Sequence, residues 1–269
     1  MNSCFHSLPS GEDPSKLVPE LKYIPRWSRR GVIRADHSEA LLRAVNRERA
    51  IQSQADRDAM KLNPQDLGKI TELTLEHYNR RAEDFWAGTR AHDVSQNIEA
   101  LLHYIEGDPP FAILDFGCGP GRDLKVFAER GHLAIGLEGA ERLAVMARAH
   151  SGCEVWQQDF LGLNLPDEHF DGVFANAALF HVPSVALPRV LLDLHASLKP
   201  RGVLFTSNPH GHNQEGWNGG RYGAYHDLDT WRGYMSAAGF VELNHYYRPS
   251  GLPREQQPWL ASVWRKLAS

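Results

Sequence analysis

The sequence predicts an α/β protein built on a doubly wound, mostly parallel sheet of seven strands, with an antiparallel C-terminal strand and an N-terminal helical cap. Two observations predict this fold. Short apolar runs alternate with helical segments between residues 111 and 206, which is the order of parallel strands joined by crossover helices. The first run, 111–116, leads into Gly117, Gly119 and Gly121, where the backbone can turn sharply and approach a ligand.

The composition bounds the class of partner. The chain has 269 residues, a net charge of -4 and a hydrophobic content of 42%, which is enough for a sizeable core. It contains no block of Lys and Arg that marks a nucleic-acid or anionic-membrane surface, and no window approaches the roughly 18 apolar residues of a membrane span. We therefore expect a cytoplasmic protein without a signal peptide, acting on a small molecule rather than on nucleic acid or a membrane. The oligomeric state stays open.

Cysteine and histidine usage argues against a metal site. Cys4, Cys118 and Cys153 are too few and too scattered for a disulfide framework or a zinc site. His210 and His212 lack helical spacing and a clear third ligand. No metal site is predicted.

Residues 1–59 differ from the rest of the chain. Four prolines interrupt the first half, and the second half is charged and poor in apolar residues. Such a segment buries too little apolar surface to offset the entropy that it loses on ordering. We predict that 1–59 is an extension, disordered or laid over the main domain, and that 60–269 is the functional domain.

Residues 60–107 are predicted to form the helical cap as two helices. Apolar positions recur every three or four residues from Asn63, and this helix is expected to end at Gly88. Ser95 is a suitable N-cap for the second helix. Phe85 is assigned to the core face of the first helix. The apolar positions are Leu67, Ile70, Thr74, Tyr78, Ala82 and Phe85, then Val94, Ile98, Leu101, Leu102 and Ile105.

Strands and helices alternate after the glycine turn. In such a sheet, ligands bind at the carboxyl ends of the parallel strands, so residues just past each strand are the candidates for a site. The expected strands are 133–138, 153–156, 170–175, 203–206, 241–247 and 259–266. The expected helices are 124–131, 140–150, 187–198 and 228–238.

Residues 207–226 are an irregular stretch rich in glycine and aromatic residues. Long loops inside compact domains often carry function, so a lid loop is predicted here. Arg221 has the planar fork that matches a carboxylate, and Tyr222, Tyr225 and His226 are candidates to line an acceptor pocket. Surface exposure or core packing is the alternative for each of these side chains.

The spacing of the glycine turn indicates its ligand. A dinucleotide site would have Gly-x-Gly-x-x-Gly, whereas this chain has Gly117-x-Gly119-x-Gly121, two residues after Asp115. The turn resembles motif I of the class I S-adenosylmethionine-dependent methyltransferases, and the resemblance extends over the domain that follows the N-terminal extension. It implies that the amino-acid end of S-adenosylmethionine, the expected cofactor, is held by Asp115, Gly117, Cys118 and Gly119.

Further positions match the same family in the same order. By this resemblance, Glu138 at the end of the second strand binds the ribose hydroxyls, and a carboxylate suits this role because it accepts from both. Asp159 and Phe160 match the acid and its neighbour that hold adenine. Asn176, at the end of the fourth strand, is expected to lie over the cofactor.

The chain looks like the small-molecule branch of this superfamily, in which an N-terminal helical segment closes over the cofactor. The resemblance places Tyr78 near the sulfonium, which aromatic faces attract, with Trp86 and Thr89 as neighbours. His181 follows the fourth strand, where many relatives present a residue to the acceptor, and is the candidate general base. Packing is the alternative for Trp86, and a loop histidine bonded to backbone is the alternative for His181.

These observations predict a methyltransferase that moves a methyl group from S-adenosylmethionine to a small polar or heteroaromatic acceptor, with nitrogen expected before sulfur or oxygen. The chemistry is an in-line displacement, so the protein must position the acceptor, exclude water and remove a proton where required. Two alternatives stay open, a non-catalytic S-adenosylmethionine-binding protein and a nucleotide-dependent oxidoreductase.

Overall fold

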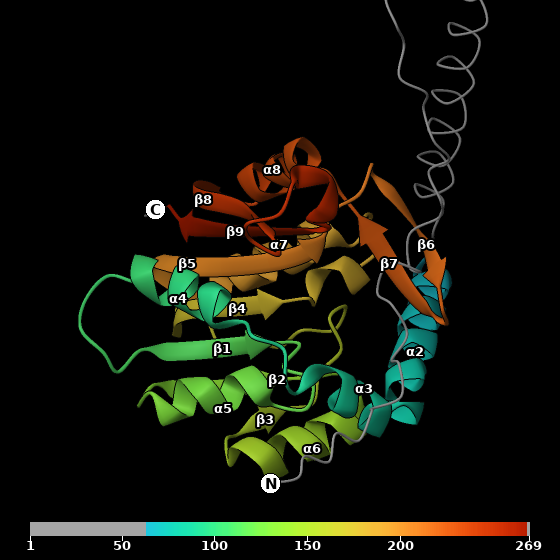
Figure 1. The fold of residues 1–269 in the computed structure, drawn as a ribbon, viewed down its shortest axis with the longest axis horizontal. Coiled ribbons are helices and arrows are strands. Elements are labelled where there is room, and N and C mark those ends of the chain that lie inside the picture. The colour runs from blue at the N-terminus through green and yellow to red at the C-terminus, as the bar shows by residue number, and fades with distance from the viewer. Residues whose placement is uncertain (1–62, 268–269) are drawn as a thin grey trace, which may run out of the picture. The chain divides into compact units, whose positions relative to one another are not determined.

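The computed structural model describes residues 63–267, so the prediction made for 1–59 lies outside the described residues. Seven strands form one sheet in the order β3-β2-β1-β4-β5-β9-β8 (Figure 1). The predicted seven-stranded sheet is therefore confirmed. Its strands are β1 (Ala112–Phe116), β2 (Leu133–Leu137), β3 (Val155–Trp156), β4 (Phe170–Asn176), β5 (Leu198–Pro209), β8 (Phe240–Arg248) and β9 (Trp259–Lys266).

Strand directions follow the prediction as well. Strand β1 pairs in parallel with β2 and β4, and β4 pairs in parallel with β5. The C-terminal strand β9 lies between β5 and β8 and is antiparallel to both. Strand β1 is buried on both faces, because Ile113 and Leu114 are fully buried on opposite sides of the sheet, and this explains its continuous apolar run.

Helices cover both faces of the sheet. On one face, Leu101 of α4 (Ser95–Tyr104) and Phe127 of α5 (Arg122–Glu129) share an apolar cluster with Phe174 and Phe205 of the central strands. Helix α6 (Glu141–Ser151) packs beside α5. On the other face, α7 (Leu187–Ser197) and α8 (Leu228–Ala237) form a second cluster with Trp264. The result is a three-layer α/β/α domain (Figure 1).

The helical cap differs from the prediction at one point. Two helices, α2 (Pro64–Arg80) and α3 (Ala82–Thr89), replace the single helix expected before Gly88. The break falls at Arg81, whose φ of -116° and ψ of 24° are not helical and whose amide bonds three residues back to the Tyr78 carbonyl. No Gly or Pro marks this position. Ala82, which follows the break, is fully buried.

The segment predicted as an irregular lid loop, 207–226, is ordered differently. The first residues of this segment belong to strand β5, and most of the others form a hairpin of β6 (Gln214–Asn218) and β7 (Arg221–Tyr225). The turn is Gly219-Gly220, with φ of 58° and 89°, which suits the two-residue turns of β-hairpins. The amide of Tyr222 donates to Thr74 Oγ1 at 3.1 Å and so ties the hairpin to α2.

Candidate active site

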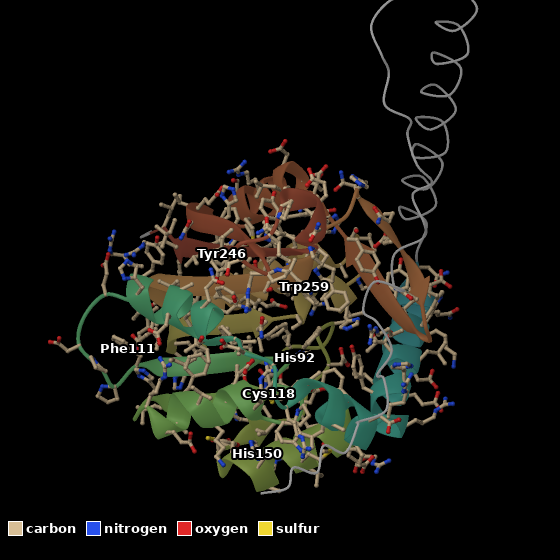
Figure 2. The ribbon with its side chains drawn as sticks, in the orientation of Figure 1. His92, Phe111, Cys118, His150, Tyr246 and Trp259 are labelled. Carbon is tan, nitrogen blue, oxygen red and sulfur yellow. The ribbon has the colours of Figure 1, made fainter. Side chains whose placement is uncertain are left out.

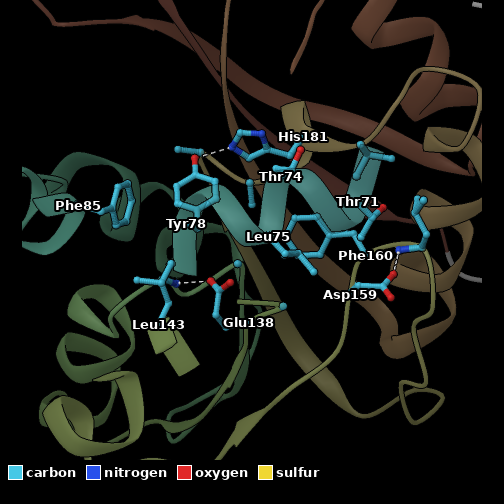
Figure 3. Close-up of a pocket in the computed structure, with 17 residues that line it drawn as sticks. Thr71, Thr74, Leu75, Tyr78, Phe85, Glu138, Leu143, Asp159, Phe160 and His181 are labelled. Atoms are coloured by element: carbon cyan, nitrogen blue, oxygen red, sulfur yellow. Dashed lines mark hydrogen bonds between the residues drawn. The ribbon is translucent and has the colours of Figure 1, made fainter. Parts of the chain in front are cut away.

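Two adjoining hollows lie at the carboxyl ends of the central strands, under the helical cap. The first encloses about 680 Å³ and the second about 1450 Å³, counting the part of each that opens to solvent. We call them the cofactor hollow (Figure 3) and the acceptor hollow, after the roles predicted for their residues. The residues that line both are Tyr78, Phe85, Gly117, Gly119 and Ala177.

The three glycines of the turn serve two purposes. Gly117 and Gly119 face the hollows with φ of 74° and 53°, a region that side chains disfavour, and a Cβ on Gly117 would lie 2.7 Å from the Cβ of Ala178. Gly121, with φ of 85°, faces the neighbouring helix instead, and a Cβ there would lie 2.9 Å from the Cα of Ala147. The first two glycines therefore give a ligand access to the backbone, and the third allows helices α5 and α6 to pack closely.

Glu138 lies on the wall of the cofactor hollow, at the end of β2. One carboxylate oxygen accepts from the amide of Gly119 at 2.9 Å and the other from the amide of Ala140 at 2.8 Å. Burial raises the pKa of Glu138, and these backbone hydrogen bonds counter part of that rise. Each oxygen keeps a further lone pair, so the fixed carboxylate can accept hydrogen bonds from a vicinal diol.

Asp159 and Phe160 line the other end of the cofactor hollow (Figure 3). Asp159 Oδ1 accepts from the Leu161 amide at 2.7 Å, which fixes the carboxylate in its loop. Phe160 stacks on Phe116, with ring centroids 4.3 Å apart. The wall here combines one carboxylate with flat apolar groups, which suits a heteroaromatic base carrying an amino group.

Asp115 and Cys118 differ in whether they face a hollow. Cys118 lines the acceptor hollow, and burial raises the pKa of its thiol, so it stays protonated at neutral pH. Asp115 lies behind the turn rather than on the wall of either hollow. Burial and the nearby Asp123 carboxylate raise the pKa of Asp115, and its Oδ2 has no hydrogen-bond partner within residues 63–267. The structure therefore does not bring Asp115, predicted to hold the cofactor, to the wall of either hollow.

A chain of hydrogen bonds connects and fixes the polar side chains that line the acceptor hollow. Asn97 donates to Asn176 Oδ1 at 3.0 Å, and Asn176 donates to Asp123 Oδ2 at 3.1 Å. The guanidinium of Arg122 donates to both oxygens of Asp123, at 2.6 and 2.9 Å, and to the carbonyl of Thr89 at 2.7 Å. Asn176 and Thr89, both predicted to bind cofactor, thus lie on the acceptor hollow with their polar groups already engaged.

Tyr78 and His181, the two candidate catalytic residues, are joined by a hydrogen bond. The Tyr78 hydroxyl lies 2.8 Å from His181 Nε2 (Figure 3). His181 Nδ1 lies 2.6 Å from the backbone carbonyl of Tyr222. Because a carbonyl can only accept, Nδ1 must carry the proton of the neutral imidazole, and Nε2 is then the acceptor for the Tyr78 hydroxyl. His181 itself lines the cofactor hollow, and its hydrogen bond to Tyr78 connects it to the acceptor hollow.

Both groups are uncharged at neutral pH. Burial lowers the pKa of His181 to about 4, and the nearby Arg221 charge adds to the effect. Burial raises the pKa of Tyr78 to about 12, although Arg221 opposes that rise. The phenol keeps oxygen lone pairs, so it can accept a hydrogen bond from a ligand while it donates to His181.

The structure does not bring Trp86 to either hollow. Phe85 and Thr89, four residues apart on α3, share the face that lines the acceptor hollow, and Trp86 lies on a neighbouring face. There its ring packs edge-on against His150 of α6, with centroids 4.8 Å apart. Its position therefore matches the packing alternative.

Of the four candidate acceptor residues on 207–226, the structure brings Arg221 to the acceptor hollow. Side chains alternate across β7, so the next residue, Tyr222, is buried on the other face against Trp217. Tyr225 packs near Phe180, with centroids 6.1 Å apart, and His226 stacks on Trp231. None of these three side chains lines either hollow, although Tyr225 packs near Phe180, which does line the acceptor hollow.

Several lining residues escaped the sequence reasoning. Phe85, assigned to the core, lines both hollows. Arg248 and Trp259 line the acceptor hollow and are paired across β8 and β9. Because β9 is antiparallel to its neighbours, its first residue lies at the edge where the parallel strands end, and Figure 2 shows Trp259 there with His92 and Cys118. An apolar alternation in the sequence carries no signal of this placement.

Within residues 63–267, no three His, Cys, Asp or Glu side chains gather as metal ligands. The same residues include no helix that is long and apolar enough to span a membrane.

Comparisons with known proteins find similarity to methyltransferases. Residues 113–202 match a family model described as a methyltransferase domain. The 24-methylenesterol C-methyltransferase 2 of Oryza sativa subsp. japonica is 31% identical over 123 residues, which are 43% of this chain and 32% of that protein. Probable tRNA methyltransferase 9B of Homo sapiens is 25% identical over 205 residues, which are 72% of this chain and 42% of that protein. The chain thus matches a third to two fifths of the length of these curated relatives.

A solved structure extends the likeness to most of the described fold. The 1,6-didemethyltoxoflavin-N1-methyltransferase of Burkholderia thailandensis, crystallised with 1,6-didemethyltoxoflavin and S-adenosylhomocysteine, has a TM-score of 0.63 and 21% identity to this chain. The match covers 77% of this chain and 91% of that chain. At this identity, the likeness establishes a shared fold.

Proposed function

Because the chain belongs to the class I S-adenosylmethionine-dependent methyltransferase superfamily, we propose that it moves a methyl group from S-adenosylmethionine to a small polar or heteroaromatic acceptor. The observation that carries the proposal is the meeting of two hollows at Gly117, Gly119 and Tyr78. One hollow offers the groups that a nucleoside needs, and the other has room for a second ligand.

The cofactor hollow fits S-adenosylmethionine. Glu138 would accept from the ribose hydroxyls, Asp159 would accept from the adenine amino group, and the ring of Phe160 would contact the base. Gly117 and Gly119 would let the amino-acid end approach the backbone. When bound there, the cofactor supplies a methyl group on a positively charged sulfur, which a nucleophile can displace in line.

Tyr78 has the position of an orienting residue. It lines both hollows, its hydroxyl proton is held by His181, and its oxygen can accept a hydrogen bond from an acceptor N–H or O–H. Such a bond would turn the lone pair of the acceptor toward the methyl group of S-adenosylmethionine. Holding two reactants in the correct orientation lowers the barrier substantially. The Tyr222 carbonyl holds the His181 ring, and His181 in turn fixes the phenol of Tyr78. His181 Nε2 could take the Tyr78 hydroxyl proton while the Tyr78 oxygen takes a proton from the acceptor.

The acceptor is proposed to be a small molecule methylated most readily at nitrogen. The polar set of Asn97, His92 and Ser207, placed beside the rings of Phe180 and Trp259, supports a polar or heteroaromatic compound. The names of these relatives include a methylenesterol, a tRNA and 1,6-didemethyltoxoflavin, so acceptor chemistry varies among them. A nucleic-acid acceptor is therefore the competing reading to be tested.

Two measurements test the proposal. Isothermal titration calorimetry with S-adenosylmethionine, S-adenosylhomocysteine and NAD(P)H should show binding of the first two and none of the third. Release of S-adenosylhomocysteine should then rise when a pool of small metabolites is added and should not rise with total tRNA. Tight cofactor binding without turnover on any pool would favour a non-catalytic binding protein, and binding of NAD(P)H in place of S-adenosylmethionine would favour the oxidoreductase.

A further inference from the structure

The acceptor hollow has an unusual balance of charge. Three arginines and two aspartates line it, which leaves one net positive charge, 3 minus 2. One arginine, Arg122, is neutralised by the bidentate contact with Asp123. The remaining carboxylate, Asp93, is exposed at the rim and accepts from the Ser95 amide at 2.9 Å. No ion pair within residues 63–267 neutralises Arg221 or Arg248, although Arg248 is near enough to Asp93 to add to the hydrogen bonds from Ser95 that lower the pKa of that carboxyl.

Arg221 is placed beside the junction of the two hollows. The carbon of its guanidinium lies 5.9 Å from the centroid of the Tyr78 ring, so its charge is next to the residue that both hollows share. Among residues 63–267, no carboxylate oxygen lies within 4.0 Å of this group. A partly buried guanidinium without an anionic partner favours an anionic ligand.

Arg248 gives a second, independent observation. One terminal nitrogen donates to the backbone carbonyl of Asp93 at 2.8 Å, which directs the side chain across the rim. Its Nε is buried and has no hydrogen-bond partner in the described part of the chain. Buried donors in native proteins are nearly always paired, so this N–H is suited to a ligand acceptor.

We propose that the acceptor is a small carboxylic acid, and that Arg221 and Arg248 bind its carboxylate in the acceptor hollow. The proposal rests on the proposed function and narrows its substrate class. It deepens that function because the two arginines would select the acceptor by charge, while Phe180 and Trp259 would contact its apolar part.

Electrostatics supports an anionic acceptor over a neutral one. Arg221 and Arg248 line the hollow that adjoins the proposed position of the cofactor sulfonium, and a neutral acceptor such as a sterol would leave these like charges without a counter-charge. A carboxylate would offset this repulsion at the place where the two hollows meet. The single net charge of the wall also suits one carboxylate better than a polyanion such as RNA, which is held by many Lys and Arg contacts.

The test compares acids with their neutral amides on the intact protein. Calorimetry would be run with and without S-adenosylhomocysteine, using nicotinate, indole-3-acetate and histidine against nicotinamide, indole-3-acetamide and histidinamide. At least one acid should bind about tenfold or more tightly than its amide, as expected for charge-assisted hydrogen bonds. Equal binding within every pair, or tighter binding of total tRNA than of any acid, would overturn the proposal.

Variants locate the effect. Arg221→Met and Arg248→Met should each abolish most of the preference for the acid, and Arg248→Lys should keep part of it. Arg189→Met is the control, because Arg189 is exposed on α7 and pairs with Asp193 at 3.9 Å, away from the hollow. Retention of the full preference in both methionine variants would refute the assignment. Failure of the wild-type protein to bind S-adenosylhomocysteine would refute the proposed function instead. The preference for acids over amides, measured without S-adenosylhomocysteine, would still decide whether the two arginines bind a carboxylate.

Discussion

Glu138 offers the sharpest test of the cofactor hollow. We expect Glu138→Gln to weaken binding of S-adenosylhomocysteine by at least about tenfold, because the amide nitrogen cannot accept a hydrogen bond from a ribose hydroxyl. A hydrogen bond to a charged group contributes about 1.5–3 kcal/mol, and about 1.4 kcal/mol corresponds to a factor of ten. Glu138→Ala, which removes the remaining acceptor oxygen too, should weaken binding further. Isothermal titration calorimetry at constant pH measures both.

The same carboxylate also holds the turn together, so stability must be measured beside affinity. Its oxygens accept from the amides of Gly119 and Ala140, at 2.9 and 2.8 Å. Leaving one buried amide unpaired should lower the free energy of unfolding by about 1–3 kcal/mol. Glu141→Gln, an exposed change three positions along the chain, is the matched control for both measurements. A folded Glu138→Ala protein that binds the ligand as tightly as wild type would refute the ribose assignment.

Three further predictions concern the junction of the hollows and the turn. Tyr78→Phe removes the donor to His181 Nε2, so turnover should fall by roughly tenfold or more while S-adenosylhomocysteine affinity changes little; equal effects on both would contradict an orienting role. His181, with its pKa lowered to about 4, binds a proton more readily in the unfolded chain, so it adds roughly 3 kcal/mol of stability above pH 6.5 that is lost as the pH falls toward 4. The free energy of unfolding, measured with urea at each pH in that range, should change less with pH in His181→Gln than in the wild type. Gly117→Ala should impair both ligand binding and stability, because its Cβ would lie 2.7 Å from the Cβ of Ala178 on the wall of the cofactor hollow, whereas Gly121→Ala should mainly lower stability. Calorimetry and melting measure the two effects, and a folded Gly117→Ala protein that binds the ligand as tightly as wild type would contradict the role of Gly117.

Local patterns were enough to predict the sheet, and the resemblance to a known family pointed to five residues that line the cofactor hollow: Gly117, Gly119, Glu138, Asp159 and Phe160. In a parallel sheet, each strand end lies at the same edge, so an acid such as Glu138 or Asp159 that directly follows a strand is carried to that edge. The glycine turn obeys the same logic, because its position depends on the strand before it. These residues are predictable from a few neighbours in the chain.

The acceptor hollow depends on contacts that no local pattern records. Tyr78 and His181 meet although they are 103 positions apart, and the group that fixes the imidazole is a backbone carbonyl, which every residue possesses. The hairpin was missed because β6 and β7 lack a regular apolar alternation, and the faces of Tyr222 and Tyr225 were therefore unassigned. The break at Arg81 was missed because it carries no Gly or Pro signal.

In the proposed reaction, the wall shared by the two hollows would link the binding of cofactor and acceptor thermodynamically. In the proposed reaction, a cationic cofactor would draw the acceptor's carboxylate toward Arg221, and by reciprocity a bound acceptor would raise cofactor affinity by the same factor. Methyl transfer leaves a neutral thioether in place of the sulfonium, so part of this mutual attraction disappears at the moment of turnover. The coupling would therefore be strong for the substrate pair and weak for the product pair, and this difference would favour the departure of products over substrates.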